Sequence, residues 1–170
     1  MPRRTIAVVS AAIALAIAGT ASAQPAPARH LTGRSISEGW RVEPGGQTKT
    51  ATVTLEFQAD DGGAVVTVDF VTRLVGREQR SAPGVVDIIV TEHPREDNTP
   101  EMRMKIDGRA EPLTTRLHSR RSIATSVPFD EFVRLTAASS LIEEAFGAEL
   151  EFSPGQLRML RFTADRWAGR

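Results

Sequence analysis

The chain has 170 residues with 21 Lys or Arg and 21 Asp or Glu, so its formal net charge is zero; this disfavours nucleic-acid binding, because phosphate neutralisation needs a basic excess. It contains no cysteine, which excludes disulfides, Cys-ligated zinc, iron–sulfur clusters and a thiol nucleophile. At this length and with 41% apolar residues, the chain can bury the core of a single domain.

The first 23 residues have the three parts of a secretory signal peptide. Arg3 and Arg4 form a basic start, residues 6–19 are an apolar run, and the Ala-Ser-Ala tripeptide at 21–23 fits the specificity of signal peptidase. The apolar run is shorter than the roughly 20 residues that cross a bilayer. We therefore expect residues 1–23 to be cleaved and no transmembrane anchor to remain. Export by the general route or by the twin-arginine route stays open.

The composition also indicates where the protein acts. Only Lys49 and Lys105 among the basic residues are lysines, and this bias, together with abundant alanine, suggests a GC-rich bacterial genome. A chain without cysteine suits an oxidising compartment, in which stray thiols would pair wrongly. We therefore expect an exported protein of the bacterial envelope, periplasmic or extracellular.

The segment after the signal peptide holds Pro25, Pro27 and Gly33 among small residues, a composition typical of a mobile segment. We expect a flexible lead-in over residues 24–38. A single strand-rich domain then follows over residues 39–170, with a short first strand around Trp40.

The clearest element is a hairpin over residues 48–75. Apolar and polar residues alternate strictly over 48–60, as in a half-buried strand, and Asp61-Gly62 is a strong hairpin-turn signal. A turn at this place aligns three apolar pairs on one face: Phe57 with Val66, Leu55 with Val68 and Val53 with Phe70. Because the turn chemistry and the apolar pattern agree on the register, we place the centre of the core here.

Further strands are predicted over residues 85–91, 101–107, 113–117 and 123–127. Asp107-Gly108 predicts another hairpin turn, and a Gly147-centred hairpin is predicted within 141–152.

The period changes to that of a helix at Phe129, and we expect a helix over 129–139. Ser153 and Gln156 form a capping box around Pro154, which predicts the start of a second helix that ends near Gly169.

These elements predict an α+β fold: a predominantly antiparallel β-sheet, sandwich-like, with two C-terminal helices. The side chains that we expect to be buried are Phe57, Val53, Leu55, Val68, Phe70, Ile88, Met104, Phe132 and Leu160.

No organised catalytic set is evident, and we assign no catalytic residue, metal ligand or cofactor. His93 lies in a charged loop whose spacing matches no zinc or calcium motif. The best candidate for ligand binding is a basic group formed by Arg116, His118, Arg120 and Arg121. If a strand continues through it, three of these side chains share one face and could hold a carboxylate or phosphate. The alternative is a solvated edge strand whose charges prevent aggregation.

We therefore expect a non-catalytic binding or accessory module, whose partner is another envelope protein or an anionic ligand. The alternative is a small periplasmic enzyme of the hydrolase type. Its site would assemble from residues distant in the sequence, with His93, His118 or an acid pair as the acid–base group.

Overall fold

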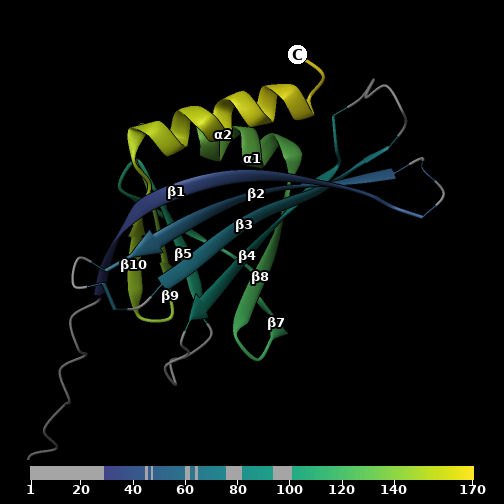
Figure 1. Ribbon diagram of the computed structural model, residues 1–170. Coiled ribbons are helices and arrows are strands. Elements are labelled where there is room, and N and C mark those ends of the chain that lie inside the picture. Colours follow the sequence, from purple (N-terminus) through teal and green to yellow (C-terminus); the bar gives the residue numbers. More distant parts are fainter. Residues whose placement is uncertain are drawn as a thin grey trace, which may run out of the picture.

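The computed structural model describes residues 29–44, 46, 48–59, 62–63, 65–75, 82–93 and 101–170 (Figure 1). The predicted signal peptide and residues 24–28 of the predicted lead-in lie outside the described residues. So does Asp61 of the predicted turn.

Ten strands in the described part of the chain form one sheet in the order β6-β5-β9-β10-β1-β2-β3-β4-β8-β7. Their bounds are β1 Arg29–Val42, β2 Thr48–Gln58, β3 Val65–Val75, β4 Val85–His93, β5 Met102–Ile106, β6 Arg109–Pro112, β7 Arg116–Ser119, β8 Ser122–Pro128, β9 Leu141–Ala145 and β10 Ala148–Glu151. Neighbouring strands are antiparallel except β1 and β10, which run parallel. Helices α1 (Phe129–Ala137) and α2 (Pro154–Trp167) complete the fold. The predicted α+β class, mainly antiparallel with two helices toward the C-terminus, is confirmed.

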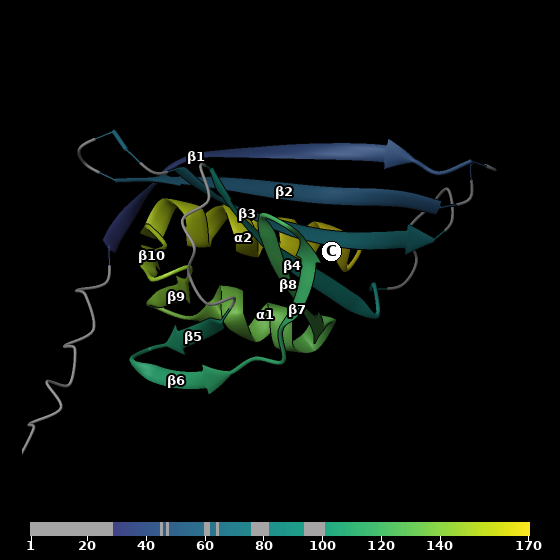
Figure 2. The ribbon, with the colours of Figure 1, turned by 90° about the horizontal axis from the view of Figure 1, so that it is seen from below.

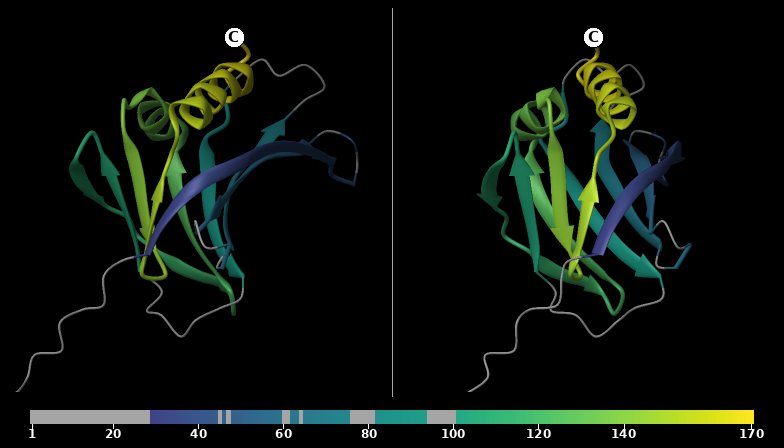
Figure 3. Two further views of the ribbon diagram at one scale, coloured as in Figure 1. Left: turned by 60° about the vertical axis from the view of Figure 1, so that its left-hand side comes forward. Right: turned by 90° about the vertical axis from the view of Figure 1, so that its left-hand side faces the viewer.

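The sheet is strongly curled but does not close, because β6 and β7 remain its two ends. Seen from below, the strands run around the two helices (Figure 2). Figure 3 shows both helices together at one end of the curl, with β5, β9 and β10 across from β4 and β8. The concave side of one continuous sheet therefore encloses the core.

The predicted hairpin forms with the predicted register: Phe57 pairs with Val66, Leu55 with Val68 and Val53 with Phe70. All nine side chains that were expected in the core are buried. Aromatic rings join the sheet to the helices, because Phe132 of α1 lies 5.5 Å from Phe70 of β3 and 5.6 Å from Trp167 of α2, between ring centres.

Local turn and cap signals are also confirmed. Asp107 and Gly108 both have positive φ (50° and 79°), as do Phe146 and Gly147 (52° and 69°), as expected for the central residues of tight hairpin turns. The Ser153 capping box at the start of α2 is complete in both directions. Helix α1 ends at Ala137, two residues earlier than expected, because the chain at Ala138 is already extended.

The predicted strand over residues 113–117 is displaced. The structure has β6 before this segment and β7 starting only at Arg116. Pro112, which has no N–H to donate, ends the pairing of β6 with β5.

The predicted lead-in is wrong for residues 29–38, which form most of strand β1. The strand was missed because its pairing register shifts between Gly33 and Ser35. This bulge places the inward side chains of Leu31 and Ile36 five residues apart, which breaks the alternation by which a strand is recognised. In the described residues, no helix is long and apolar enough to cross a membrane.

Candidate binding surface

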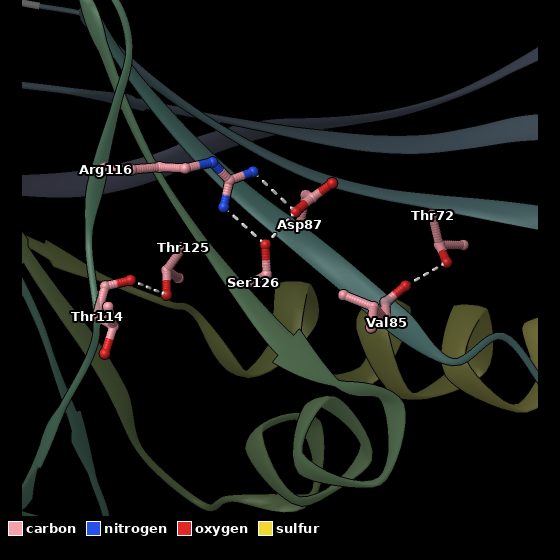
Figure 4. A network of polar contacts seen from close by, with 7 residues as sticks. All are labelled: Thr72, Val85, Asp87, Thr114, Arg116, Thr125 and Ser126. Atoms are coloured by element: carbon pink, nitrogen blue, oxygen red, sulfur yellow. Dashed lines mark hydrogen bonds and ion pairs between the residues drawn. The ribbon is translucent and has the colours of Figure 1, made fainter.

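Arg116, from the predicted basic group, is bonded to its own sheet (Figure 4). Its Nη1 donates to Ser126 Oγ at 2.7 Å and its Nη2 donates to Asp87 Oδ1 at 3.1 Å. Ser126 Oγ donates to the same Asp87 oxygen at 2.5 Å. Because these residues lie on β7, β8 and β4, the guanidinium links three strands on the outer face of the sheet. Both terminal nitrogens of the Arg116 guanidinium are therefore already bonded, one to a carboxylate and one to a hydroxyl.

The rest of the basic group does not form the expected face. β7 ends at Ser119, its pairing with β8 shifts between Leu117 and Ser119, and Arg120 and Arg121 lie in the following turn. The alternation that was expected to align Arg116, His118 and Arg120 is therefore interrupted. The reason is geometric, since the tight reversal into β8 begins within the segment. We call Arg116, His118, Arg120 and Arg121 the β7 rim; all four residues are exposed.

The histidines do not come together with a pair of carboxylates in the described part of the chain. His30 Nε2 lies 3.2 Å from Glu151 Oε2, with both side chains about half exposed. His118 is exposed on the β7 rim, and the side chain of His93 lies outside the described residues. Among those residues, no group of three His, Asp or Glu side chains is placed to hold a metal ion. The hydrolase alternative stays a prediction.

Among the described residues, two carboxyl groups are buried inside the curl, and sequence reasoning missed both. Glu92 is fully buried, and its Oε1 is 2.5 Å from Arg29 Nη2, so this ion pair joins β4 to the start of β1. Glu143 is fully buried, and neither of its oxygens has a partner in the described part of the chain. Burial raises the pKa of Glu143 to about 8. The sequence did hold one sign of this burial: Glu143 occupies the same face of strand β9 as Leu141 and Ala145, which point inward.

A pocket of about 470 Å³ lies beside β5 and β6. Charged groups on its wall are already paired: Glu101 contacts Arg103 at 3.2 Å, and Glu111 contacts Arg134 of α1 at 3.3 Å. It therefore offers no unpaired charge to a ligand from these groups.

The most open part of the sheet is one edge of β1. Only its first four residues, 29–32, pair with β10, whereas its pairing with β2 continues to Val42. No described strand pairs with the outer side of residues 34–42, which we call the β1 edge. All nine residues of the β1 edge are exposed except Ile36, which is partly buried. Along residues 35–42, the edge thus presents backbone groups that no described strand pairs.

An aromatic and cationic group lies on the concave side beside the β1 edge. The guanidinium of Arg166 lies 5.2 Å from the ring centre of Trp40 and 5.7 Å from that of Phe162. Trp40 is 48% exposed and Phe162 is 59% exposed. We call Trp40, Arg166 and Phe162 the aromatic stack. Contacts of this kind are favourable because the face of an aromatic ring attracts a cation.

Glu38 holds the aromatic stack in place. Its Oε2 accepts a hydrogen bond from Arg166 at 2.5 Å, and its Oε1 accepts one from Thr163 at 2.8 Å. The hydrogen bond from Arg166 is the main reason why the pKa of Glu38 is lowered. Both partners belong to α2, so the helix and β1 together fix the positions of the two exposed rings.

Three basic residues lie at the far end of β1, β2 and β3. Arg41 aligns with Thr50 of β2, and Thr50 aligns with Arg73 of β3, while Lys49 stands next to Thr50 on the opposite face. We call Arg41, Lys49 and Arg73 the basic tip. None of them has an ion pair within the described residues. Among the described residues Glu43, which accepts a hydrogen bond from Thr50 at 2.7 Å, is the acidic group beside them, so these four residues together carry a net charge of about +2.

Comparison with protein-family models, with curated proteins and with solved structures finds no match for this chain.

Proposed function

We propose that the protein is an exported, non-catalytic binding module of the bacterial envelope, and that it binds a protein partner along the β1 edge. The observation that carries this proposal is the nine-residue strand edge that no described strand covers, with exposed aromatic rings beside it. An exposed edge is a template for one further strand, whose backbone hydrogen bonds supply affinity.

The contrast with the two ends of the sheet supports this proposal. The end strands β6 and β7 have only four residues each. β6 ends in Pro112, and β7 carries Arg116 and His118. Short strands, proline and charge are the usual means by which proteins protect sheet edges from unwanted pairing. The β1 edge is more than twice as long and contains no proline, although it does carry the charged residues Arg34, Glu38 and Arg41.

Backbone pairing along a strand edge does not distinguish one partner sequence from another. The aromatic stack can supply this selectivity through contacts with side chains of the partner. Trp and Arg are enriched among the residues that dominate protein interfaces. Here the ion pair of Glu38 with Arg166 orders the cation before a partner arrives, which reduces the entropy lost on binding.

Capture from envelope extract tests the proposed function. We expect the double variant Trp40→Ala/Phe162→Ala to lose the partner that the wild-type protein captures. The matched control is Leu117→Ala, because Leu117 is also a large exposed apolar residue (66%) but lies on β7. A double variant that captures the same partner as well as wild type does would contradict the proposal.

Export is tested separately by the mass of the protein recovered from the cell envelope or medium. We expect a mature chain that begins at Gln24. Recovery of a chain with an intact Met1 from the membrane fraction would contradict the prediction.

A further inference from the structure

Building on the proposed function, we infer that the occupant of the β1 edge is an extended acidic segment of a partner protein. It adds as one more strand, places an apolar side chain against the aromatic stack, and places acidic side chains at the basic tip. Three observations lead to this class of partner.

The first observation is the face of the sheet on which alternate side chains of the β1 edge lie. Ile36, Glu38 and Trp40 align with Leu55, Val53 and Ala51 of β2, three buried residues of the concave side. Side chains on a neighbouring strand share faces in the same alternation. Every second residue of an added strand therefore lies on the concave side, on which Trp40 and Phe162 offer an apolar contact.

The second observation is charge. The basic tip keeps a net positive charge after Glu43 is counted, and Arg41 belongs to the β1 edge itself. Exposed charges act over about 8–10 Å at physiological salt. An added strand lies about 5 Å from β1, which carries Arg41, and about 10 Å from β2, which carries Lys49. Arg73 on β3 is one strand further away and contributes least. Acidic side chains on that strand therefore meet an attractive potential, whereas basic ones are repelled.

The third observation argues against a second copy of this chain as the occupant. Within residues 35–42 the β1 edge carries Arg41 and the single acid Glu38, and Glu38 is already paired with Arg166. An identical edge consequently brings no free acidic group to the basic tip. Charge complementarity favours a different, acidic chain.

Selection from a displayed library of random peptides, each about twelve residues long so that it can span the edge, tests the inference on the purified protein. We expect the enriched peptides to be acidic, with at least one large apolar residue. Their binding should weaken with added salt, because the attraction is between exposed charges. Hydrogen exchange should show new protection of backbone amides within residues 34–42 when a selected peptide binds.

Two variants with the same change in net charge are compared, and the one on the β7 rim is the control. Arg41→Glu/Lys49→Glu should weaken the selected peptides by about tenfold or more, because the two basic-tip residues nearest the added strand then repel its acidic side chains. Arg116→Glu/Arg120→Glu makes the same change of charge on the β7 rim and should leave their affinity unchanged. Thermal unfolding of both variants checks that each is folded, because Arg116 is bonded to Asp87 and Ser126.

The outcomes separate this inference from the proposed function. Neutral or basic peptides that protect residues 34–42 would overturn the acidic partner and leave the strand-binding function standing. Acidic peptides whose binding is lost only in the Arg116→Glu/Arg120→Glu variant would overturn both and restore the β7 rim as the anion site. A dimer in sedimentation that Trp40→Ala dissociates would make a second copy the occupant. A library without enriched peptides would contradict the inference.

Discussion

Glu143 has the least favourable surroundings of the carboxyl groups described above. It lies between Met104 of β5 and Leu150 of β10 in the pairing register, and it faces the core. An isolated buried charge is costly, so the group avoids the cost by keeping its proton. With a pKa raised to about 8, Glu143 is mainly a neutral acid at pH 7 in the folded protein.

This proton makes stability depend on pH. The pKa of Glu143 is about 8 when folded against 4.5 ordinarily, so the folded state binds more protons between these values. The free energy of unfolding therefore falls as the pH rises from about 4.5 to 8, by at most about 1.4 kcal/mol per pH unit.

Urea unfolding at several pH values within this window checks the prediction, with Glu143→Gln as the comparison. The neutral amide has no proton to lose, so we expect a flatter profile for the variant. Parallel profiles for the two proteins would contradict the assignment to Glu143.

At the scale of the element, β1 shows how one residue permits a strand to bend past a helix. A Cβ built on Gly33 would lie 2.1 Å from the side-chain amide of Gln156, far inside contact distance. Gln156 cannot move away easily, because its Oε1 accepts a hydrogen bond from Ser153 N in the capping box of α2. Gly33 therefore lets β1 and the start of α2 approach each other.

Gly33→Ala should lower the free energy of unfolding by about 1–3 kcal/mol, as overpacking does in a filled interior. Gly39→Ala is the matched control, because a Cβ at this position of the same strand meets nothing within 4 Å. Chemical denaturation measures both. Equal effects of the two substitutions would show that the contact with Gln156 is relieved without cost.

The β2–β3 hairpin depends on the side chains that were predicted to fill its inner face. Phe57 is fully buried, and its ring centre lies 5.0 Å from that of Phe152. Phe57→Ala should therefore cost about 3–5 kcal/mol. Val75→Ala, at a position 72% exposed near the end of β3, should change stability little. A loss below about 1 kcal/mol for Phe57→Ala would contradict the packing.

At the scale of the whole molecule, β1 joins the two halves of the curl. It pairs in parallel with β10, near the C-terminus, and in antiparallel with β2. The ion pair of Arg29 with Glu92 adds a link from β1 to β4 across the interior. Helix α2 closes the same assembly, because its Trp167 is fully buried against α1.

This interlocking predicts a single cooperative unfolding transition. The fluorescence of Trp167 and the far-ultraviolet circular dichroism should change at the same denaturant concentration. Trp40→Phe removes the signal of the half-exposed second tryptophan. A fluorescence midpoint that precedes the dichroism midpoint would indicate that α2 detaches before the sheet unfolds.

The sequence alone determined the elements whose causes are local. The alternation over residues 48–60, the Asp107-Gly108 turn and the Ser153 capping box each involve residues a few positions apart. Such signals are short-ranged, because they arise from side-chain phase, permitted φ angles and hydrogen bonds to the nearest backbone groups. The mainly antiparallel class, the hairpin register and the core around Phe57 followed from them.

Only the tertiary structure decided where the pairing between distant strands ends. The pairing of β1 with β10 joins residues more than 100 positions apart, and its end at Thr32 leaves the β1 edge uncovered within the described part of the chain. The partner of Arg116 is Asp87, 29 residues away, which no local pattern of basic residues reveals. Long-range pairing is set by the shared burial of distant segments, so the candidate binding surface could not be found from the sequence pattern alone.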